Sequence, residues 1–262
     1  MPIFAIMIKN IISLVIRKVP RPYLQLVSHH IAKGLSLFYQ GNDVECPVCQ
    51  KHFRKFLPYG RKARENALCP NCLALERHRL MYLFLRRKTN FFTAPLRVLH
   101  VAPEICFIGR FEKQQNLEYT TADIESPLAK VKMDIHAIPF PENSFDVILC
   151  NHVMEHVADD GLAMRELYRV LRPGGWGIIQ IPLFHPLPET TYEDASITSP
   201  AAREKAFGQN DHVRLYGKDY ADRLRAAGFM VEENCYTKEL PVEEVERYAL
   251  PTDEIIFYVK KL

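Results

Sequence analysis

Two pairs of closely spaced cysteines place the strongest single constraint on what this chain can fold into. Cys46-Pro-Val-Cys49 and Cys69-Pro-Asn-Cys72 are separated by nineteen residues. Two residues between thiols allow a tight turn to direct both sulfurs at one ion, and two such turns complete a tetrahedron. Four thiolates leave no open position for catalysis, so the spacing predicts a structural zinc site. Iron in a rubredoxin-like site has the same ligand set and stays an alternative.

The remaining cysteines, Cys106, Cys150 and Cys235, are scattered and bring the total to seven. An odd number in a chain of 262 residues argues against a secreted disulfide framework and favours the reducing cytoplasm. The apolar fraction of 48% and the charged fraction of 25% exclude collagen, a disordered tail and a polytopic membrane protein.

Charge is divided unevenly along the chain. Residues 1–90 contain 16 Lys and Arg against 4 Asp and Glu, a net +12, whereas residues 91–262 contain 18 against 27, a net −9. The asymmetry predicts units with different roles, the first of which meets an anionic partner. We expect an amphipathic helical segment at 1–42, a four-cysteine module with a helix at 43–90, and a larger body at 91–262.

The expected helical segment is apolar from Ile3 to Ile16, a run shorter than the roughly 20 residues that span a bilayer. A second apolar stripe recurs at helical spacing. Its members are Leu24, Val27, Ile31, Leu35 and Phe38. Two interpretations stay open: these helices pack on the protein's own body or a partner subunit, or they lie on an anionic membrane surface at the inner face of the membrane.

The module at 43–90 is strongly basic, since residues 51–88 hold eleven Lys and Arg against Glu65 and Glu76. Interleaved aromatic residues allow one hypothesis of an RNA-binding surface, with arginines on phosphates and aromatics on bases. The alternative is a solvated face around a small aromatic core. Leu73 to Lys88 reads as a helix with leucines inward and arginines outward.

Strand and helix patterns alternate through the body. Apolar runs predict strands at 96–101, 117–122, 145–150 and 176–181, and amphipathic stretches predict helices at 105–115 and 159–171. Such alternation is typical of an α/β fold with a doubly wound, mostly parallel sheet, which binds ligands at the carboxyl ends of its strands.

Three sequence blocks in this body occur in an order that is typical of a known family. They are the stretch from Asp134 to His156, Glu166-Leu-Tyr-Arg-Val-Leu-Arg-Pro-Gly-Gly-Trp176, and Leu224-Arg-Ala-Ala-Gly-Phe229. In this order they resemble the class I S-adenosylmethionine-dependent methyltransferases of the type 11 group. The resemblance covers about residues 95–262 and implies a Rossmann-like seven-stranded sheet with S-adenosylmethionine as cofactor.

The resemblance also implies where the cofactor binds. Asp123 ends the second strand of the body, where a carboxylate accepts hydrogen bonds from ribose hydroxyls, and Ile124 follows it. Asp134 and the backbone of Ile135 are implied beside the adenine amine, and Asn151 beside the methionine end. A plain helix-capping or turn role is the alternative for both aspartates.

The first loop of the body departs from the family pattern, which reads acidic-x-Gly-x-Gly-x-Gly. The corresponding residues here are His100-Val-Ala102-Pro-Glu104-Ile-Cys106, without glycine. Glycine there permits positive φ and close approach of backbone to ligand. Either the loop takes another shape, with His100, Ala102 and Glu104 at the cofactor and Glu104 holding its amino group, or cofactor affinity is weak or lost.

Two histidines are candidates for the base in methyl transfer: His152, after the strand at 145–150, and His212, in the long segment between Pro182 and Gly217. His152-Val-Met-Glu-His156 also matches a zinc-peptidase motif, but that motif requires both histidines on one helix, whereas a strand ending at Cys150 places His152 in a turn.

Three functional hypotheses follow. The first is a methyltransferase with a structural zinc that acts on a small molecule or a glycan precursor. The second is an RNA methyltransferase that holds RNA with the basic module. The third is a non-catalytic binding or scaffold protein that has lost the cofactor. The acceptor atom and the oligomeric state stay open.

Overall fold

The computed structural model describes residues 33–34, 36–60 and 63–262. Most of the amphipathic segment expected at 1–42 lies outside these residues. Within its described end, a short 3-10 turn, η1 (Leu37–Tyr39), leads directly into strand β1 (Gln40–Cys46).

A seven-stranded mixed sheet forms the centre of the body, in the order β12-β13-β9-β8-β5-β6-β7. Its strands are β5 (Leu96–Val101), β6 (Leu117–Asp123), β7 (Val131–Lys132), β8 (Phe145–Asn151), β9 (Leu171–Gln180), β12 (Met230–Asn234) and β13 (Ile256–Lys260). The pairs from β7 to β9 are parallel, while β13 runs antiparallel to β9 and to β12. The Rossmann-like sheet expected from the sequence is confirmed.

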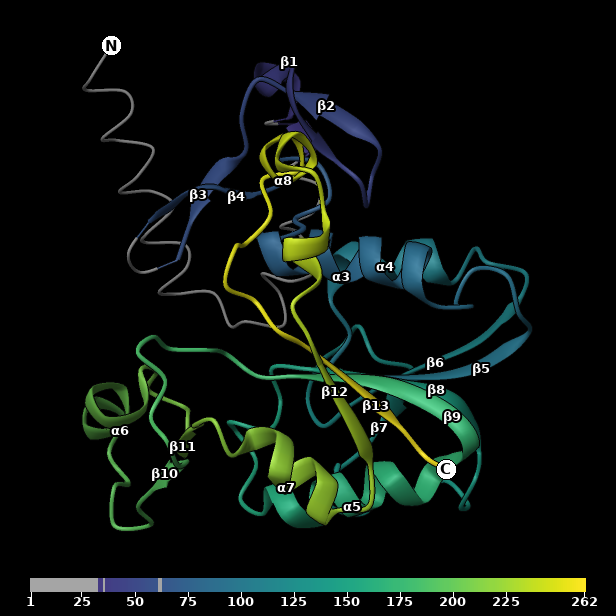
Figure 1. Cartoon of the computed structure of the whole chain (residues 1–262), viewed down its shortest axis with the longest axis vertical. Helices are drawn as coiled ribbons and strands as arrows, with labels where there is room; N and C mark the ends of the chain where they lie inside the picture. Colours follow the sequence, from purple (N-terminus) through teal and green to yellow (C-terminus); the bar gives the residue numbers. More distant parts are fainter. Residues whose placement is uncertain (1–32, 35, 61–62) are drawn as a thin grey trace.

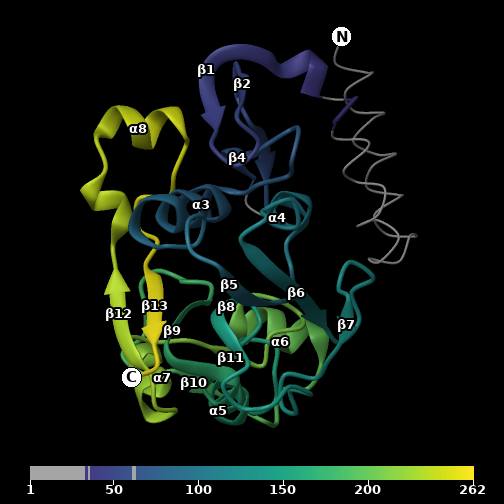
Figure 2. The ribbon, with the colours of Figure 1, turned by 90° about the vertical axis from the view of Figure 1, so that its right-hand side faces the viewer.

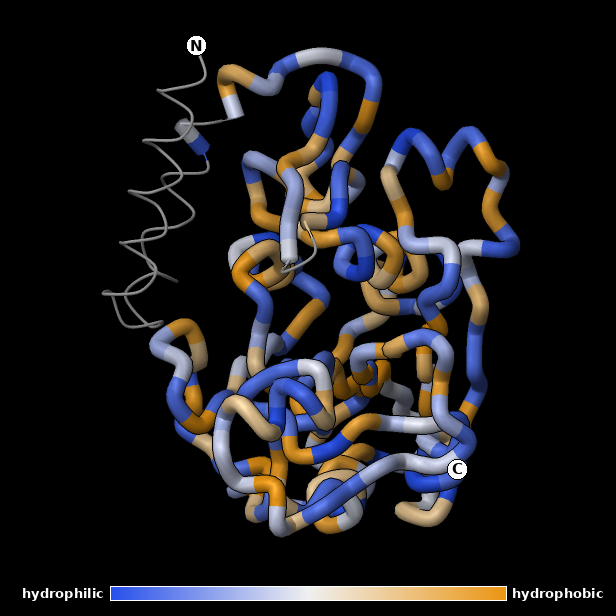
Figure 3. Tube along the Cα trace, turned by 90° about the vertical axis from the view of Figure 1, so that its left-hand side faces the viewer, coloured by the Kyte–Doolittle hydropathy of each residue, from blue (hydrophilic) through white to orange (hydrophobic). Residues whose placement is uncertain are grey.

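Helices cover both faces of this sheet (Figure 1). One face carries α3 (Glu76–Lys88) and α4 (Ile105–Phe111), and the other carries α5 (Asp160–Val170) and α7 (Tyr220–Ala226). Alternate residues of β8 supply the two cores: Val147 and Leu149 belong to the first, and Ile148 and Cys150 to the second. In Figure 3 hydrophobic stretches cross the interior of the body and alternate with hydrophilic residues along the chain.

The four-cysteine module consists of two hairpins above α3. The first pairs β1 with β2 (Lys51–Phe53), and the second pairs β3 (Leu57–Tyr59) with β4 (Arg64–Leu68). Its buried residues share one continuous core with α3 and the sheet. The helix therefore belongs to both units, because it starts at the module and packs on the sheet.

An arm between β12 and β13 rises beside the module (Figure 2). It contains η2 (Tyr236–Glu239) and α8 (Val242–Arg247) and contacts β1. Ion pairs join the arm to the basic third of the chain. They are Arg87–Glu244, Lys88–Glu239 and Arg247–Glu45. Part of the positive charge of the module thus faces the acidic body of the same chain.

The long segment after β9 folds back on the body as a two-stranded ribbon and a helix. Strand β10 (Tyr192–Glu193) pairs with β11 (Arg214–Leu215), and α6 (Pro200–Phe207) lies between them in the chain. No helix in the described part of the chain is long and apolar enough to cross a membrane.

Candidate functional site

The four predicted metal ligands converge on one point in the module. The sulfurs of Cys46 and Cys72 lie 3.6 Å apart, and those of Cys49 and Cys69 lie 3.7 Å apart. Sulfurs at about 2.3 Å from a zinc ion stand about 3.8 Å apart at the corners of a tetrahedron. The cysteines are unpaired, and the spacing excludes S–S bonds, so the donor set fits a four-thiolate zinc ion.

Both cysteine pairs use the same turn. The backbone N–H of Gln50 donates to the carbonyl of Cys46, and that of Leu73 donates to the carbonyl of Cys69. Gln50 and Leu73 both take positive φ, of 57° and 63°. The repeated turn directs both thiols of each pair to the same side, as a metal knuckle requires.

Arg79 corrects the expectation that every arginine of α3 faces outward. Its side chain is fully buried, and its guanidinium donates to the carbonyls of Ala67 and Ala74 in the module and of Tyr248 and Ala249 in the arm. It also lies 4.3 Å from the ring centroid of a phenylalanine of the module. The planar fork of arginine suits this task because its five N–H groups serve several acceptors at once. A charged residue in an amphipathic helix is normally exposed, so the sequence pattern of α3 gave no sign that Arg79 is buried.

A buried hydrogen-bond network lies at the carboxyl ends of β5 and β8. Nε2 of His100 lies 2.6 Å from the Glu104 carboxylate, and Nδ2 of Asn151 donates to its other oxygen at 3.0 Å. Both ring nitrogens of His100 are satisfied when the hydroxyl of Tyr119 donates to Nδ1 and Nε2–H donates to Glu104. Burial disfavours the charged form of Glu104, but the attraction of His100 and His78 outweighs it and lowers the pKa of Glu104 to about 2.

Ala102 replaces the family's glycine in conformation as well as in position. Its φ is 49°, in the left-handed region that glycine adopts at no steric cost. Its N–H donates to the carbonyl of Ala122 at the end of β6. The loop therefore makes the expected tight turn without glycine and brings Glu104 to the start of α4.

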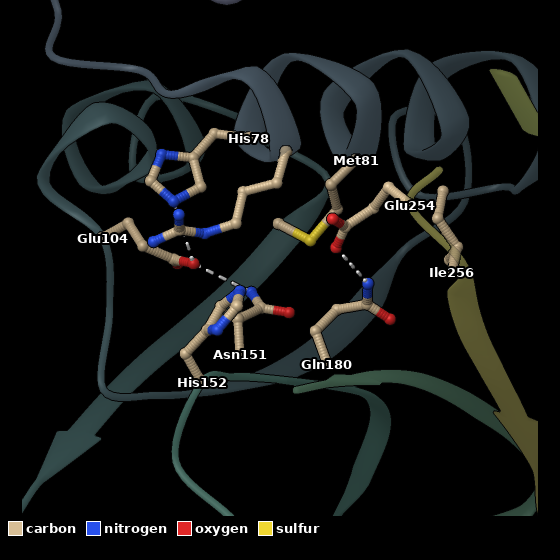
Figure 4. Close-up of a pocket in the computed structure, with 9 residues that line it drawn as sticks. His78, Met81, Glu104, Asn151, His152, Gln180, Glu254 and Ile256 are labelled. Atoms are coloured by element: carbon tan, nitrogen blue, oxygen red, sulfur yellow. Dashed lines mark hydrogen bonds and ion pairs between the residues drawn. The ribbon is translucent and has the colours of Figure 1, made fainter. Parts of the chain in front are cut away.

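A narrow pocket adjoins this network (Figure 4). The described residues that line it include Glu104, Asn151 and His152 from the body. Its open space is about 10 Å³, roughly the room that one water molecule needs. Asn151 Oδ1 and His152 Nε2 are buried and have no hydrogen-bond partner among the described residues. Orphaned polar atoms of this kind fit a polar ligand, and a carboxylate beside a carbonyl oxygen suits an ammonium group.

Sequence reasoning missed the other wall of the pocket, which comes from α3 and the arm. Arg77, His78 and Glu254 line it, and Nε of Arg77 and Nε2 of His78 lack partners in the part of the chain that the structure describes. Burial lowers the pKa of His78 to about 3, and Nδ1 accepts the N–H of Leu75, so Nε2–H faces Glu104 at 3.8 Å. No pattern in the sequence relates the cysteine module to this pocket.

The residues expected at the adenosine end lie along the next strands. Asp123 ends β6, and its Oδ1 accepts the N–H groups of the two residues that follow Ile124. Ile124 itself is 54% exposed. Asp134 is exposed and accepts from the backbone and ring of His136, which lowers its pKa, whereas Ile135 is buried. Both aspartates therefore order turns.

The two expected bases lie at different depths. His152 is partly exposed, has a φ of 55°, and places Nδ1 3.5 Å from Glu155. His212 is fully buried, and its Nδ1 lies 3.1 Å from the carbonyl of Phe207. No helix includes residues 152–156, so the peptidase motif lacks the helix it requires.

Comparison with known proteins supports the sequence resemblance. A family model described as a methyltransferase domain, of the type 11 group, matches residues 108–179. An uncharacterised transposon protein of Streptomyces fradiae is 29% identical over 60% of this chain and 44% of its own length. A ubiquinone/menaquinone biosynthesis C-methyltransferase of Pseudoalteromonas translucida is 47% identical over 17% of this chain and 18% of its own. The chain spans less than half the length of these curated relatives.

Solved structures match more of the chain at lower identity. An S-adenosylmethionine-dependent methyltransferase from Mesorhizobium loti covers 70% of this chain and 98% of its own, at 17% identity and a TM-score of 0.46. The family match starts in α4, the helix after the Glu104 loop, and ends within β9. Over residues 108–179 the chain therefore matches the methyltransferase domain family of the type 11 group.

Proposed function

We propose that this protein transfers the methyl group of S-adenosylmethionine to a small molecule or a glycan precursor and that the four cysteines bind zinc in a structural, non-catalytic role. The observation that supports this most is the buried Glu104 network with its orphaned polar atoms, at the sheet edge where the domain family binds cofactor. The unpaired cysteines suit the reducing cytoplasm.

Residues along the carboxyl edge of the sheet would bind different parts of the cofactor. Glu104 and Asn151 would hold the amino group of the cofactor and Arg77 its carboxylate, while His100 orients Glu104. Asp123 would accept from the ribose, with Ile124 and Ile135 against the adenine and Asp134 near its amine. The cofactor supplies an electrophilic methyl group on a sulfonium, and the protein supplies in-line positioning.

A base is needed when the acceptor is a hydroxyl or an amine. His152 is the better placed of the two expected bases, because it lines the pocket and its Nε2 is unpartnered among the described residues. His212 is too deeply buried to reach an acceptor directly.

Calorimetric titration with S-adenosylmethionine tests the proposal. We expect saturable binding by the wild type and a loss of about tenfold or more in Glu104→Gln, since a hydrogen bond to a charged group contributes about 1.5–3 kcal/mol. Asp194→Asn is the matched control, because that exposed aspartate only orders its own turn. Absence of saturable binding by the wild type would favour the non-catalytic scaffold instead.

RNA is the second candidate acceptor, because Lys51, Arg54 and Lys55 are exposed on the module. Binding to RNA is driven partly by the release of counterions from the phosphates, so its affinity should fall steeply as the salt concentration rises. A fluorescence anisotropy titration with RNA at several salt concentrations distinguishes an RNA acceptor from a small-molecule acceptor. Tight binding with a steep slope would support the RNA acceptor over the small molecule.

A further inference from the structure

A second cluster of metal-binding side chains lies on the other side of His152 from the cofactor pocket. Glu155 and His156 belong to the loop after β8, and His212 lies just before β11. One ligand atom from each of these three residues lies within 4.8 Å of the others. Neither the zinc module nor the cofactor pocket accounts for this cluster.

The tautomers of both histidines are fixed by backbone carbonyls. Nδ1 of His212 lies 3.1 Å from the carbonyl of Phe207, and Nδ1 of His156 lies 3.3 Å from the carbonyl of Asp211. A carbonyl oxygen can only accept, so each Nδ1 carries a proton, and in the neutral ring Nε2 then presents a lone pair. This arrangement is the one that orients histidine ligands in metal sites.

The carboxylate of Glu155 lies beside these rings. Nε2 of His156 lies 3.9 Å from Oε1 of Glu155, and Nε2 of His212 is buried without a hydrogen-bond partner in the described structure. The Glu155 side chain is 2% exposed, and its Oε2 has no hydrogen-bond partner among the described residues. A buried carboxylate with an unpaired oxygen, beside two neutral imidazole rings, is unfavourable unless a cation lies among them.

We propose that Glu155, His156 and His212 bind one divalent transition-metal ion. Two imidazole nitrogens and one carboxylate suit Mn²⁺, Fe²⁺, Co²⁺ or Zn²⁺ better than Mg²⁺. Ligand atoms around such an ion stand roughly 3–3.5 Å apart, so the cluster must contract by about 1.5 Å, which side-chain rotation supplies.

The metal site connects with the cofactor pocket through one residue. His152 directs Nδ1 toward Glu155 at 3.5 Å, while the same ring lines the pocket beside Asn151 (Figure 4). Three protein ligands leave coordination positions open, and His156, the most exposed ligand, marks the side from which an oxygen of the acceptor would enter. The use of the ion to hold an acceptor rests on the proposed function, whereas metal binding itself does not.

Titration of the zinc-loaded protein with Co²⁺ tests the inference. We expect one Co²⁺ per chain beyond the zinc, with d–d absorption in the visible but no thiolate charge-transfer band, because the ligands are nitrogen and oxygen. Elemental analysis after gel filtration gives the stoichiometry. His156→Ala and Glu155→Gln should each weaken Co²⁺ binding by at least about tenfold.

His185→Ala is the matched control, since this half-exposed histidine lies in the same long segment and pairs only loosely with Asp253. It should leave Co²⁺ affinity unchanged. No Co²⁺ beyond the zinc, or undiminished affinity in both ligand variants, would overturn the inference. Calorimetry with S-adenosylmethionine on the same samples tests the proposed function separately. Intact cofactor binding without Co²⁺ binding would rule out the metal site and leave the proposed function standing.

Discussion

Two residues at the edge of the cofactor pocket take a backbone conformation that costs energy. Ala102 follows β5 and His152 follows β8, with φ of 49° and 55°. The left-handed region costs a residue with a Cβ about 1–2 kcal/mol. Two such turns on neighbouring strands lead into Glu104 and the His152 ring, which both line the pocket with Asn151, so the strain lies beside the proposed cofactor site.

Ala102→Gly tests this strain directly. Relief of the left-handed penalty outweighs the entropy that glycine adds to the unfolded chain, so we expect the free energy of unfolding to rise by up to about 1 kcal/mol. Ala102→Val should lower it by about 1–2 kcal/mol. Urea unfolding monitored by circular dichroism measures both. Ala137→Gly, at an exposed turn without positive φ, should instead lose about 0.4–1 kcal/mol, and the same sign at both sites would contradict the argument.

Glu104 also makes stability depend on pH. Its pKa falls from 4.5 to about 2 on folding, so the ionised carboxylate stabilises the folded state above pH 4.5, and this contribution disappears as the pH falls toward 2. The difference corresponds to about 3 kcal/mol. We expect the wild type to lose more stability over this range than Glu104→Gln. Acid release of zinc affects both proteins, so equal losses in urea unfolding would show that Glu104 contributes nothing.

At the scale of elements, the sequence predicted three of the parallel strands closely, placed the start of β9 (Leu171–Gln180) five residues too late, and predicted the connections poorly. The run at 96–101 coincides with β5, and those at 117–122 and 145–150 fall one residue short of β6 and β8. Long apolar runs bounded by turn residues specify buried strands through local pattern alone. The two-residue strands β10 and β11 and the arm with α8 depend on tertiary contacts, which no local pattern carries.

Arg79 is where local pattern was most misleading, and it joins three elements. Replacement by methionine removes the guanidinium that donates to carbonyls of the module and of the arm. Each buried unpaired acceptor costs about 1–3 kcal/mol, so we expect Arg79→Met to lower the free energy of unfolding by about 3 kcal/mol or more. Arg86→Met, at an exposed position of the same helix, should change it by less than about 0.5 kcal/mol. Similar losses in thermal or urea unfolding of the two variants would refute this role.

At the scale of the whole molecule, some charges of the basic N-terminal third form ion pairs with the acidic body of the same chain. Arg87 and Lys88 of α3 pair with Glu244 and Glu239 of the arm, and Arg247 of the arm pairs with Glu45 of the module. The sequence predicted that the basic third would meet an anionic partner, and one such partner is the acidic body itself. The wall of the pocket that α3 and the arm supply could not be predicted from the sequence. These two elements reach the pocket only because the module and the arm pack against each other and the body.

This docking connects the metal module to the cofactor pocket. Helix α3 begins four positions after Cys72 and carries Arg77 and His78 into the pocket wall within its first turn. A zinc ion held by the four thiolates would fix the two cysteine turns, and the second of these turns sets where α3 starts. The expected role of zinc is therefore to position one side of the cofactor site from a distance.

Removal of zinc should consequently weaken cofactor binding although no cysteine lines the pocket. After chelation, we expect affinity for S-adenosylmethionine to fall by about tenfold, a loss typical of disturbed supporting residues, and to return when zinc is restored. Calorimetry measures the affinity, and circular dichroism verifies that the sheet stays folded. Because Glu104 and Asn151 belong to the body, part of the affinity should survive, and Arg77→Met should lose less on chelation than the wild type. Unchanged affinity in the zinc-free protein would mean that the body alone forms the site and that α3 only covers it.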